Sequence, residues 1–178
     1  MHWRHLEQWL RQGGRVLLVN EAAAVRRLHY ACLQSPVGPF WVFWAAGVVC
    51  MAGFTEDPAR VHAGRQRPMA WIREPCVPAA LVDSQGRVRV AVTGTPFQER
   101  VWRALARVAP GNTCSYQALA RAAGSPRAAR AVGNAVAANP IALFLPCHRV
   151  VRSDGSLGGY HWGGAVKAGL LRWERGLR

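Results

Sequence analysis

The chain has 178 residues, which is enough for one ordinary domain or two small ones. Lysine and arginine number 23 against nine aspartate and glutamate residues, a formal net charge of +14, and 51% of the residues are hydrophobic. This composition excludes a disordered or fibrous chain. The charge favours a polyanionic partner, either nucleic acid or an acidic membrane surface, although a basic but otherwise ordinary protein from an arginine-rich genome has the same charge.

Cysteine usage indicates a reducing compartment. The five cysteines are an odd number without a CxxC pair, and no secretory signal opens the chain, so we expect free thiols in a cytoplasmic protein. His29 and His62 lack metal-ligand spacing to these cysteines, so no metal site is predicted. The cysteines are Cys32, Cys50, Cys76, Cys114 and Cys147.

Residues 1–92 alternate short apolar runs with proline and glycine, which is typical of an α+β domain with a small sheet. Helical spacing predicts a first helix through Trp3, Leu6, Trp9 and Leu10. The uncharged stretch Val37–Phe54 approaches the length of a membrane span, but its glycines and aromatic residues favour two buried strands, so no membrane partner is predicted. The expected strands are Val16–Val19, Phe40–Trp44, Val48–Phe54 and Val88–Val92.

Residues 93–178 read as a second, helical domain. Thr95 to Gln98 form a capping box with Pro96 at the first helical position, and Pro110-Gly111 ends that helix. Ser115 caps a second helix, Tyr116–Ala123, which Gly124 ends. Ser125-Pro126 starts a third, Arg127 to about Ala138. Two short helices joined by a turn predict a helix-turn-helix.

The third helix separates small apolar residues from polar ones. Ala129, Val132, Gly133 and Val136 share one face, whereas Arg127, Arg130 and Asn134 share the other. Small residues allow a backbone to approach either a DNA groove or a neighbouring helix closely. The exposed arginine pair favours DNA.

A cysteine beside a histidine follows this helix. Asn139-Pro140 ends the helix, and Ile141–Leu145 is predicted as a buried strand that leads into Pro146-Cys147-His148. A nearby base or positive charge activates a thiol, which makes Cys147 a candidate nucleophile. A buried structural cysteine is the alternative. In an extended chain His148 points away from Cys147, so a bridging water or a tight turn is required.

Pro146-Cys147-His148-Arg149-Val150 resembles the active-site motif of the O6-alkylguanine-DNA alkyltransferases, also called methylated-DNA–protein-cysteine methyltransferases. The resemblance covers about 80 residues in family order. Further matching residues are Gly94 to Gln98, Val101-Trp102, Ser115-Tyr116, Leu119-Ala120, Arg130 to Gly133, Asn139-Pro140, Gly159-Tyr160, Lys167, Leu170-Leu171 and Glu174. The N-terminal half is similar only around Gly38-Pro39-Phe40.

The resemblance implies a ribonuclease-H-like sheet domain followed by a winged-helix-like DNA-binding domain that carries the active-site cysteine. It implies that Cys147 accepts the alkyl group irreversibly, mainly methyl from O6 of guanine and also from O4 of thymine. His148 is then the base, acting through a water, Glu174 orients the imidazole, and Asn139 holds the active-site turn. No cofactor is implied, because the damaged DNA supplies the alkyl group.

The same resemblance implies how a monomer engages double-stranded DNA. The helix from Arg127 lies in the minor groove, and Arg130 fills the space that the flipped nucleotide leaves. The other implied DNA contacts are Ser115, Ala128, Ala129 and Gly133, and the implied base contacts are Tyr116, Val150, Tyr160 and His161. When it is bound to DNA, the protein is expected to be associated with the nucleoid.

The sequence differs from the family pattern in some places, and three other functions are alternatives to alkyl transfer. His161 and Trp162 differ from many relatives, and no zinc ligands or long extra domain match. A non-enzymatic alkylguanine-binding sensor carries Trp where Cys147 stands. A helix-turn-helix transcription factor would not need Cys147, His148 and Glu174 together. A Cys-His-Glu thiol hydrolase would turn over many times and act without DNA.

Overall fold

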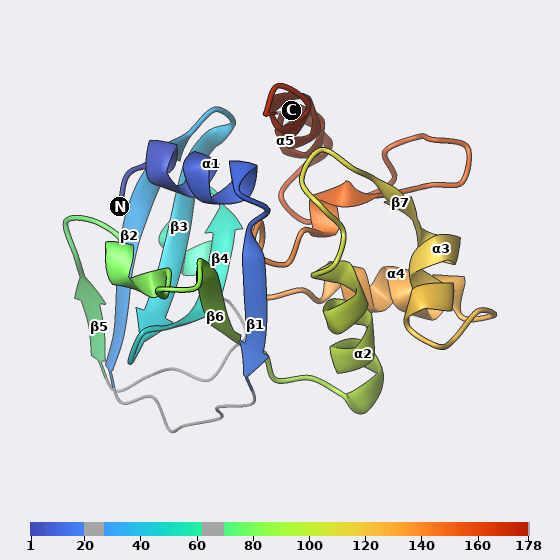
Figure 1. Cartoon of the computed structure of the whole chain (residues 1–178), viewed down its shortest axis with the longest axis horizontal. Coiled ribbons are helices and arrows are strands. Elements are labelled where there is room, and N and C mark those ends of the chain that lie inside the picture. The colour runs from blue at the N-terminus through green and yellow to red at the C-terminus, as the bar shows by residue number, and fades with distance from the viewer. Residues whose placement is uncertain (20–26, 62–69, 178) are drawn as a thin grey trace.

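A six-stranded mixed sheet forms the N-terminal half of the protein (Figure 1). The computed structural model describes residues 1–19, 27–61 and 70–177, so His62 lies outside the described part. In the order β1-β6-β4-β3-β2-β5, the strands are β1 (Arg15–Val19), β6 (Arg87–Ala91), β4 (Val48–Phe54), β3 (Gly38–Ala45), β2 (Arg27–Ser35) and β5 (Ala70–Arg73).

Strands β2, β3 and β4 form an antiparallel meander, and the outer strands join it in parallel. Ala46 and Gly47, between β3 and β4, have φ angles of 48° and 74°, the left-handed pair that a tight hairpin requires. The uncharged stretch from Val37 is therefore a hairpin, as predicted. No helix of the described residues is long and apolar enough to cross a membrane.

Among the described residues, five α-helices accompany the sheet. Helix α1 crosses one face of the sheet, α2, α3 and α4 form the other half, and α5 lies between the two halves (Figure 1). Their bounds are α1 Trp3–Arg11, α2 Pro96–Leu105, α3 Tyr116–Ala122, α4 Ala129–Ala137 and α5 Gly164–Arg175. A two-stranded parallel sheet, β7 (Cys114–Ser115) with β8 (Val150–Val151), joins α3 to the segment after Cys147.

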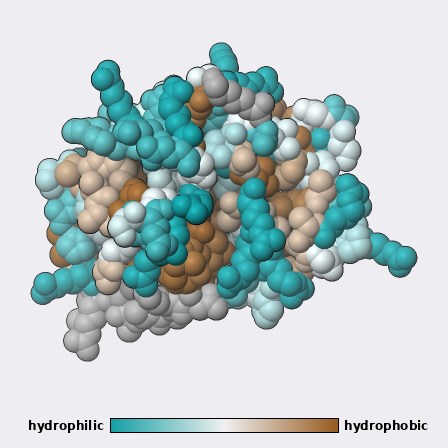
Figure 2. All heavy atoms as spheres, viewed as in Figure 1, coloured by the Kyte–Doolittle hydropathy of each residue, from teal (hydrophilic) through white to brown (hydrophobic). Residues whose placement is uncertain are grey.

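One hydrophobic cluster runs through both halves. Leu6 of α1, Phe40 of β3, Trp102 of α2 and Leu145 all belong to it and are buried. The α+β class with a sheet half and a helical half is thereby confirmed. The division into domains 1–92 and 93–178 stays a prediction. Outside the core, Figure 2 shows a surface rich in hydrophilic side chains with smaller apolar areas between them.

Most of the expected elements are confirmed, with two kinds of exception. Strands β2 and β5 were not predicted, and in β2 the buried residues Leu28, Ala31 and Leu33 do not alternate strictly, so the period of two is hidden. The predicted strand Ile141–Leu145 is wrong. Only Ile141 forms a bridge to the sheet, and Leu143 has a left-handed φ of 69° because the chain turns there. Every residue of this run is buried, so its composition could not distinguish a strand from a turn.

Replacing Thr95 with alanine tests the capping box of α2. Thr95 Oγ1 accepts from the Gln98 N–H at 3.2 Å, and Gln98 Oε1 accepts from the Thr95 N–H at 2.8 Å. We expect Thr95→Ala to lower the free energy of unfolding by about 1 kcal/mol in urea denaturation. The Gln98 N–H loses its acceptor, and the Gln98 side chain that caps the N–H of residue 95 is held less firmly. Exposed Thr93→Ala is the control, with an expected loss below about 0.5 kcal/mol. Equal losses would contradict the capping role.

Candidate active site

Cys147 opens a single 3-10 turn, Cys147–Arg149, rather than ending a strand. Pro146 precedes the turn, and β8 follows it. Cys147 as a whole residue is 7% exposed, and the next two residues, His148 and Arg149, are also buried. Of the two alternatives that the sequence left open, a bridging water or a tight turn, the structure shows a tight turn at Cys147–Arg149. The neighbours of this turn decide whether the thiol is reactive or merely structural.

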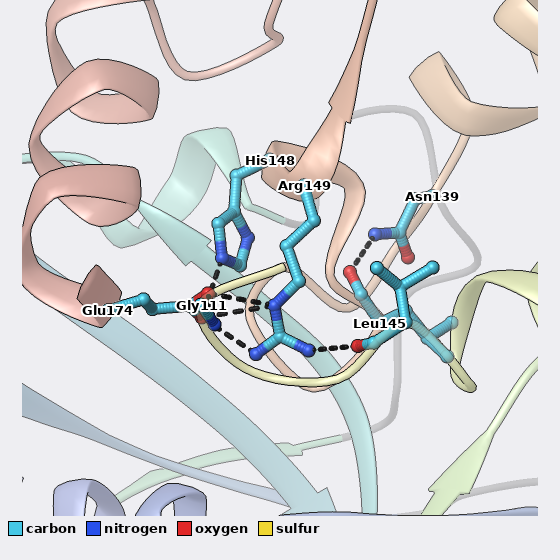
Figure 3. Close-up of polar contacts among 7 residues, drawn as sticks. Gly111, Asn139, Leu145, His148, Arg149 and Glu174 are labelled. Carbon is cyan, nitrogen blue, oxygen red and sulfur yellow. Dashed lines mark hydrogen bonds and ion pairs between the residues drawn. The ribbon is translucent and has the colours of Figure 1, made fainter. Parts of the chain in front are cut away.

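Asn139 links three parts of the chain around the thiol. Its Nδ2 donates to Cys147 Sγ at 3.0 Å and to the Leu145 carbonyl at 2.8 Å (Figure 3 draws the Leu145 contact). Its Oδ1 accepts from the Ile141 N–H at 3.0 Å. The side chain thus spans the turn before Cys147 and places an N–H donor on the sulfur, where it favours the thiolate.

The Cys147 thiol is protonated at neutral pH. Burial raises its pKa, and Asn139, the nearby Tyr160 hydroxyl and the Lys167 ammonium only oppose that rise. The Tyr160 hydroxyl is itself buried, and no partner with good hydrogen-bond geometry meets it among the described residues. Burial and the nearby Cys147 raise the Tyr160 pKa well above its ordinary value. The thiol therefore needs a base before it can act as a nucleophile.

His148 has the geometry of that base. Its Nε2 lies 2.9 Å from Glu174 Oε1 on α5 (Figure 3), and both side chains are fully buried. Burial lowers the His148 pKa although Glu174 opposes the shift, so the imidazole is neutral at pH 7. The hydrogen bond to a carboxylate fixes the proton on Nε2. The buried Nδ1 has no partner among the described residues and so offers a lone pair.

Arg149 completes the environment of Glu174, and sequence reasoning assigned it no role. Its Nε lies 2.9 Å from Glu174 Oε2, its Nη2 lies 2.7 Å from Oε1, and its Nη1 donates to the Val108 carbonyl. Glu174 Oε2 also accepts from the Gly111 N–H at 3.0 Å. Burial alone would raise the Glu174 pKa, but His148 and Arg149 outweigh it and lower the pKa to about 2. A buried arginine is almost always paired with a carboxylate, so Arg149 within a buried motif was the one sign in the sequence of a buried ion pair.

Lys167 is the second residue that sequence reasoning left without a role. It is fully buried on α5, and its Nζ donates to the carbonyls of Val150 at 2.6 Å, of Gly159 at 3.4 Å, and of Leu157. A lysine that satisfies three carbonyls joins β8 to the loop before Tyr160. Val150, a predicted base contact, is therefore held by its main chain.

Tyr116 lies at the start of α3, near the thiol. Burial raises its pKa first, and the nearby Cys147 raises it further. Its ring lies over Gly133 of α4, where an added Cβ would come within 3.9 Å, and its hydroxyl would come within 3.3 Å of a Cβ at Gly158. Ser115 Oγ accepts from the Ala118 N–H at 3.0 Å and so caps α3 as predicted. A DNA contact by Ser115 stays a prediction.

The α4 helix separates its faces as the sequence indicated. Val132, Ala135 and Val136 are buried against the core, whereas Arg127 and Arg130 are exposed. The helix begins at Ala129 rather than Arg127, so Arg127 and Ala128 lie in the turn before it. His161, a predicted base contact, is exposed. Its ring packs edge to face against the Trp162 ring, with 4.5 Å between the ring centroids. The DNA and base contacts of these residues stay predictions. No group of three potential metal ligands occurs within the described ranges.

Comparison with known proteins identifies the family. Residues 96–176 match the family model of the 6-O-methylguanine DNA methyltransferase DNA-binding domain. A methylated-DNA–protein-cysteine methyltransferase of Methanosarcina barkeri is 48% identical over 158 residues, which cover 83% of this chain and 97% of that protein. The chain belongs to the methylated-DNA–protein-cysteine methyltransferase family.

Solved structures of the methyltransferase family share the fold. The crystal structure of Mycobacterium tuberculosis OGT in complex with DNA is 35% identical, with a TM-score of 0.70, and the match covers 84% of this chain and 94% of that chain. The bifunctional transcriptional activator/DNA repair enzyme Ada of Escherichia coli is 57% identical over 83 residues, 47% of this chain. This stretch is 23% of Ada, so the chain spans only a small part of that relative.

The pH dependence of stability tests the buried Glu174 carboxylate. Its folded pKa of about 2 lies below the ordinary 4.5, so its stabilising effect is complete above about pH 4.5 and is lost as the pH falls toward 2. A shift of this size contributes about 3 kcal/mol at neutral pH. We expect Glu174→Gln to lack this acid-sensitive component in urea unfolding measured between pH 2 and 7. Glu99→Gln, which alters a partly exposed pair with Arg103 on α2, is the control and should retain this component. Identical pH profiles in wild type and Glu174→Gln would contradict the assignment.

Proposed function

We propose that this protein repairs alkylated DNA by direct reversal, transferring the alkyl group of O6-alkylguanine, mainly methyl, and of O4-alkylthymine onto Cys147. The observation that carries the proposal is a buried thiol bound by Asn139 beside a neutral His148 that Glu174 orients. All four residues lie inside the segment that matches the family model. The curated relatives are named as methyltransferases whose methyl acceptor is a protein cysteine.

The first step is proton transfer from Cys147. His148 Nδ1 is buried with a free lone pair, and it takes the thiol proton through a bridging water. The imidazolium that forms is stabilised by the Glu174 carboxylate at 2.9 Å. Because burial raises the pKa of Cys147, the thiolate exists mainly when this base accepts its proton. Asn139 then stabilises the sulfur anion through its N–H donor.

The second step moves the alkyl carbon. The thiolate forms an S–C bond as the C–O6 bond breaks, and the electron pair of that bond remains on guanine. Tyr116, near the thiol, donates a hydrogen bond to the guanine anion. Guanine finally takes up one proton, and the proton that His148 removed from Cys147 replaces it, so no net proton is gained or lost. The thioether product is chemically inert, so each molecule acts once. The alkyl donor is the DNA itself, and no cofactor takes part.

DNA docking uses the α4 face. A base inside a duplex cannot present O6 to a buried thiol, so the nucleotide must rotate out at a cost of a few kcal/mol. Exposed Arg130 replaces the lost stacking, and Arg127 binds the backbone. The small residues Ala128, Ala129 and Gly133, with Ser115, let α4 enter the minor groove of double-stranded DNA. Main-chain groups of Val150 and His161, with Tyr160, bind the extruded base.

The protein acts as a monomer, on the chromosome. A relative of known structure is described as an OGT in complex with DNA, which supports a DNA partner. The alternative of a damage sensor without transferase activity is not favoured, because a sensor does not need the Cys147, His148 and Glu174 arrangement.

Intact-protein mass after mixing with excess duplex DNA that contains O6-methylguanine tests the function. We expect a gain of one methyl group per molecule, mapped to Cys147 by peptide analysis. Cys147→Ala should gain none, and Cys114→Ala, which removes a half-buried thiol on β7, should still gain one. Tight binding without a mass change would leave the damage sensor as the better account.

Replacing Arg130 with alanine tests nucleotide extrusion. We expect the single-turnover rate on duplex DNA to fall about tenfold to a hundredfold, because the cost of unstacking is no longer offset. The rate on single-stranded DNA should change much less. Arg121→Ala, which removes an exposed arginine of α3, is the control for net charge. Equal losses on duplex and single strands would show that Arg130 acts only through general attraction to DNA.

A further inference from the structure

Strand β4 holds the segment that precedes the active-site turn. It pairs with β6 at Val49, and farther along the strand Ala52 pairs with the chain around Ile141. The Ala52 N–H donates to the Pro140 carbonyl at 3.1 Å, and the Ala52 carbonyl accepts from the Ala142 N–H at 2.9 Å. Asn139, whose amide contacts Cys147 Sγ, is the residue directly before Pro140. The sheet therefore fixes the main chain next to Asn139.

The next residue of β4, Gly53, is covered by Trp162. A Cβ at position 53 would lie 2.3 Å from Trp162 Cζ2 and 2.5 Å from Cη2, far inside van der Waals contact. Only glycine leaves room for the indole at this distance. The Trp162 ring also packs against both hydrophobic clusters, the main core and the smaller one around Trp41. The loop that carries Trp162 is thus fixed to the sheet at one point.

Trp162 belongs to the turn that carries Tyr160. The Gly163 N–H donates to the Tyr160 carbonyl at 3.1 Å and closes this turn. The Tyr160 hydroxyl lies close enough to Cys147 to act on its pKa. Neighbouring residues of one strand, Ala52 and Gly53, therefore hold the two segments whose side chains, Asn139 and Tyr160, lie at the thiol.

We propose that β4 is a positioning element of the acceptor site, in which the close contact of Gly53 with Trp162 sets the place of Tyr160 relative to Cys147, while Ala52 sets that of Asn139. In this proposal Gly53 and Trp162 act on the thiol through Tyr160. This gives the N-terminal sheet a role in the chemistry of the C-terminal half. Displacements of about 1 Å at such positions cost reactions up to about a hundredfold in rate.

The proposal rests on the proposed function only for its alkyl-transfer readout, so the experiment also measures Cys147 without DNA. The probes are iodoacetamide, mapped to Cys147 by peptide mass, and duplex DNA with O6-methylguanine. We expect Gly53→Ala to slow both reactions about tenfold, because the methyl group displaces the indole. Gly164→Ala is the control, since a Cβ there meets no atom within 4 Å, and both rates should stay unchanged.

A double-mutant cycle shows whether the effect runs through Trp162. Trp162→Ala should also slow both reactions, and adding Gly53→Ala should then slow them no further, because the methyl group occupies the space that the ring has left. Independent, multiplicative losses would overturn the proposal. Trp162→Phe, with a smaller ring, keeps the test open if Gly53→Ala does not fold, and it should give an intermediate rate.

The pH profile separates positioning from a merely structural role. Besides the base His148, the groups that interact with the thiol are Tyr116, Asn139, Tyr160 and Lys167, and of these only Tyr160 is carried by the Trp162 turn. Gly53→Ala should move the iodoacetamide profile of Cys147 to higher pH, and it should add nothing in a Tyr160→Phe background. A loss of stability with unchanged rates and profile would overturn the proposal. Wild type that reacts with iodoacetamide but not with alkylated DNA would overturn the proposed function and leave this proposal standing.

Discussion

The buried Glu174 carboxylate is the interaction on which the site depends. It binds the His148 imidazole, the Arg149 guanidinium and the Gly111 N–H together, and so joins α5, the active-site turn and the loop after α2. Burying a charge is costly unless it is paired and fully hydrogen-bonded, and these donors meet that condition. Loss of Glu174 would leave the buried Arg149 guanidinium as an unpaired charge, and loss of Arg149 would leave the Glu174 carboxylate without its charged partner. The C-terminal half is therefore held together by the same group that orients the base.

Burial sets the protonation states of both Cys147 and His148. Burial keeps Cys147 protonated and His148 neutral, so neither group is reactive alone at neutral pH. A thiol held in this way reacts slowly with electrophiles until His148 accepts its proton. This restraint is consistent with the single alkyl transfer proposed for Cys147. The sheet contributes by holding, through Ala52 and Gly53, the segments on which Asn139 and Tyr160 lie.

Elements with local signals could be predicted from the sequence. The capping residues Thr95 and Ser115 marked the starts of α2 and α3 correctly, because a cap is a local hydrogen bond, whereas α2 ends at Leu105, before the Pro110-Gly111 stop that was predicted. The run Ile141–Leu145 could not be assigned correctly, since uniform burial leaves no periodicity. The roles of Arg149 and Lys167 were missed because their partners are a carboxylate 25 residues away and main-chain carbonyls, which leave no pattern in the chain. The motif around Cys147 located the site, and only the fold revealed what holds it.

The proposed chemistry depends on a neutral His148 whose Nε2–H is held by Glu174 and whose Nδ1 has no partner among the described residues. The most direct measurement is the NMR spectrum of the protein with nitrogen-15-labelled histidine at pH 7, with His148→Gln used to assign the signal. We predict a neutral imidazole with the proton on Nε2, unchanged down to a pH below the ordinary histidine range. A protonated His148 at neutral pH, or a neutral ring with its proton on Nδ1, would contradict the account.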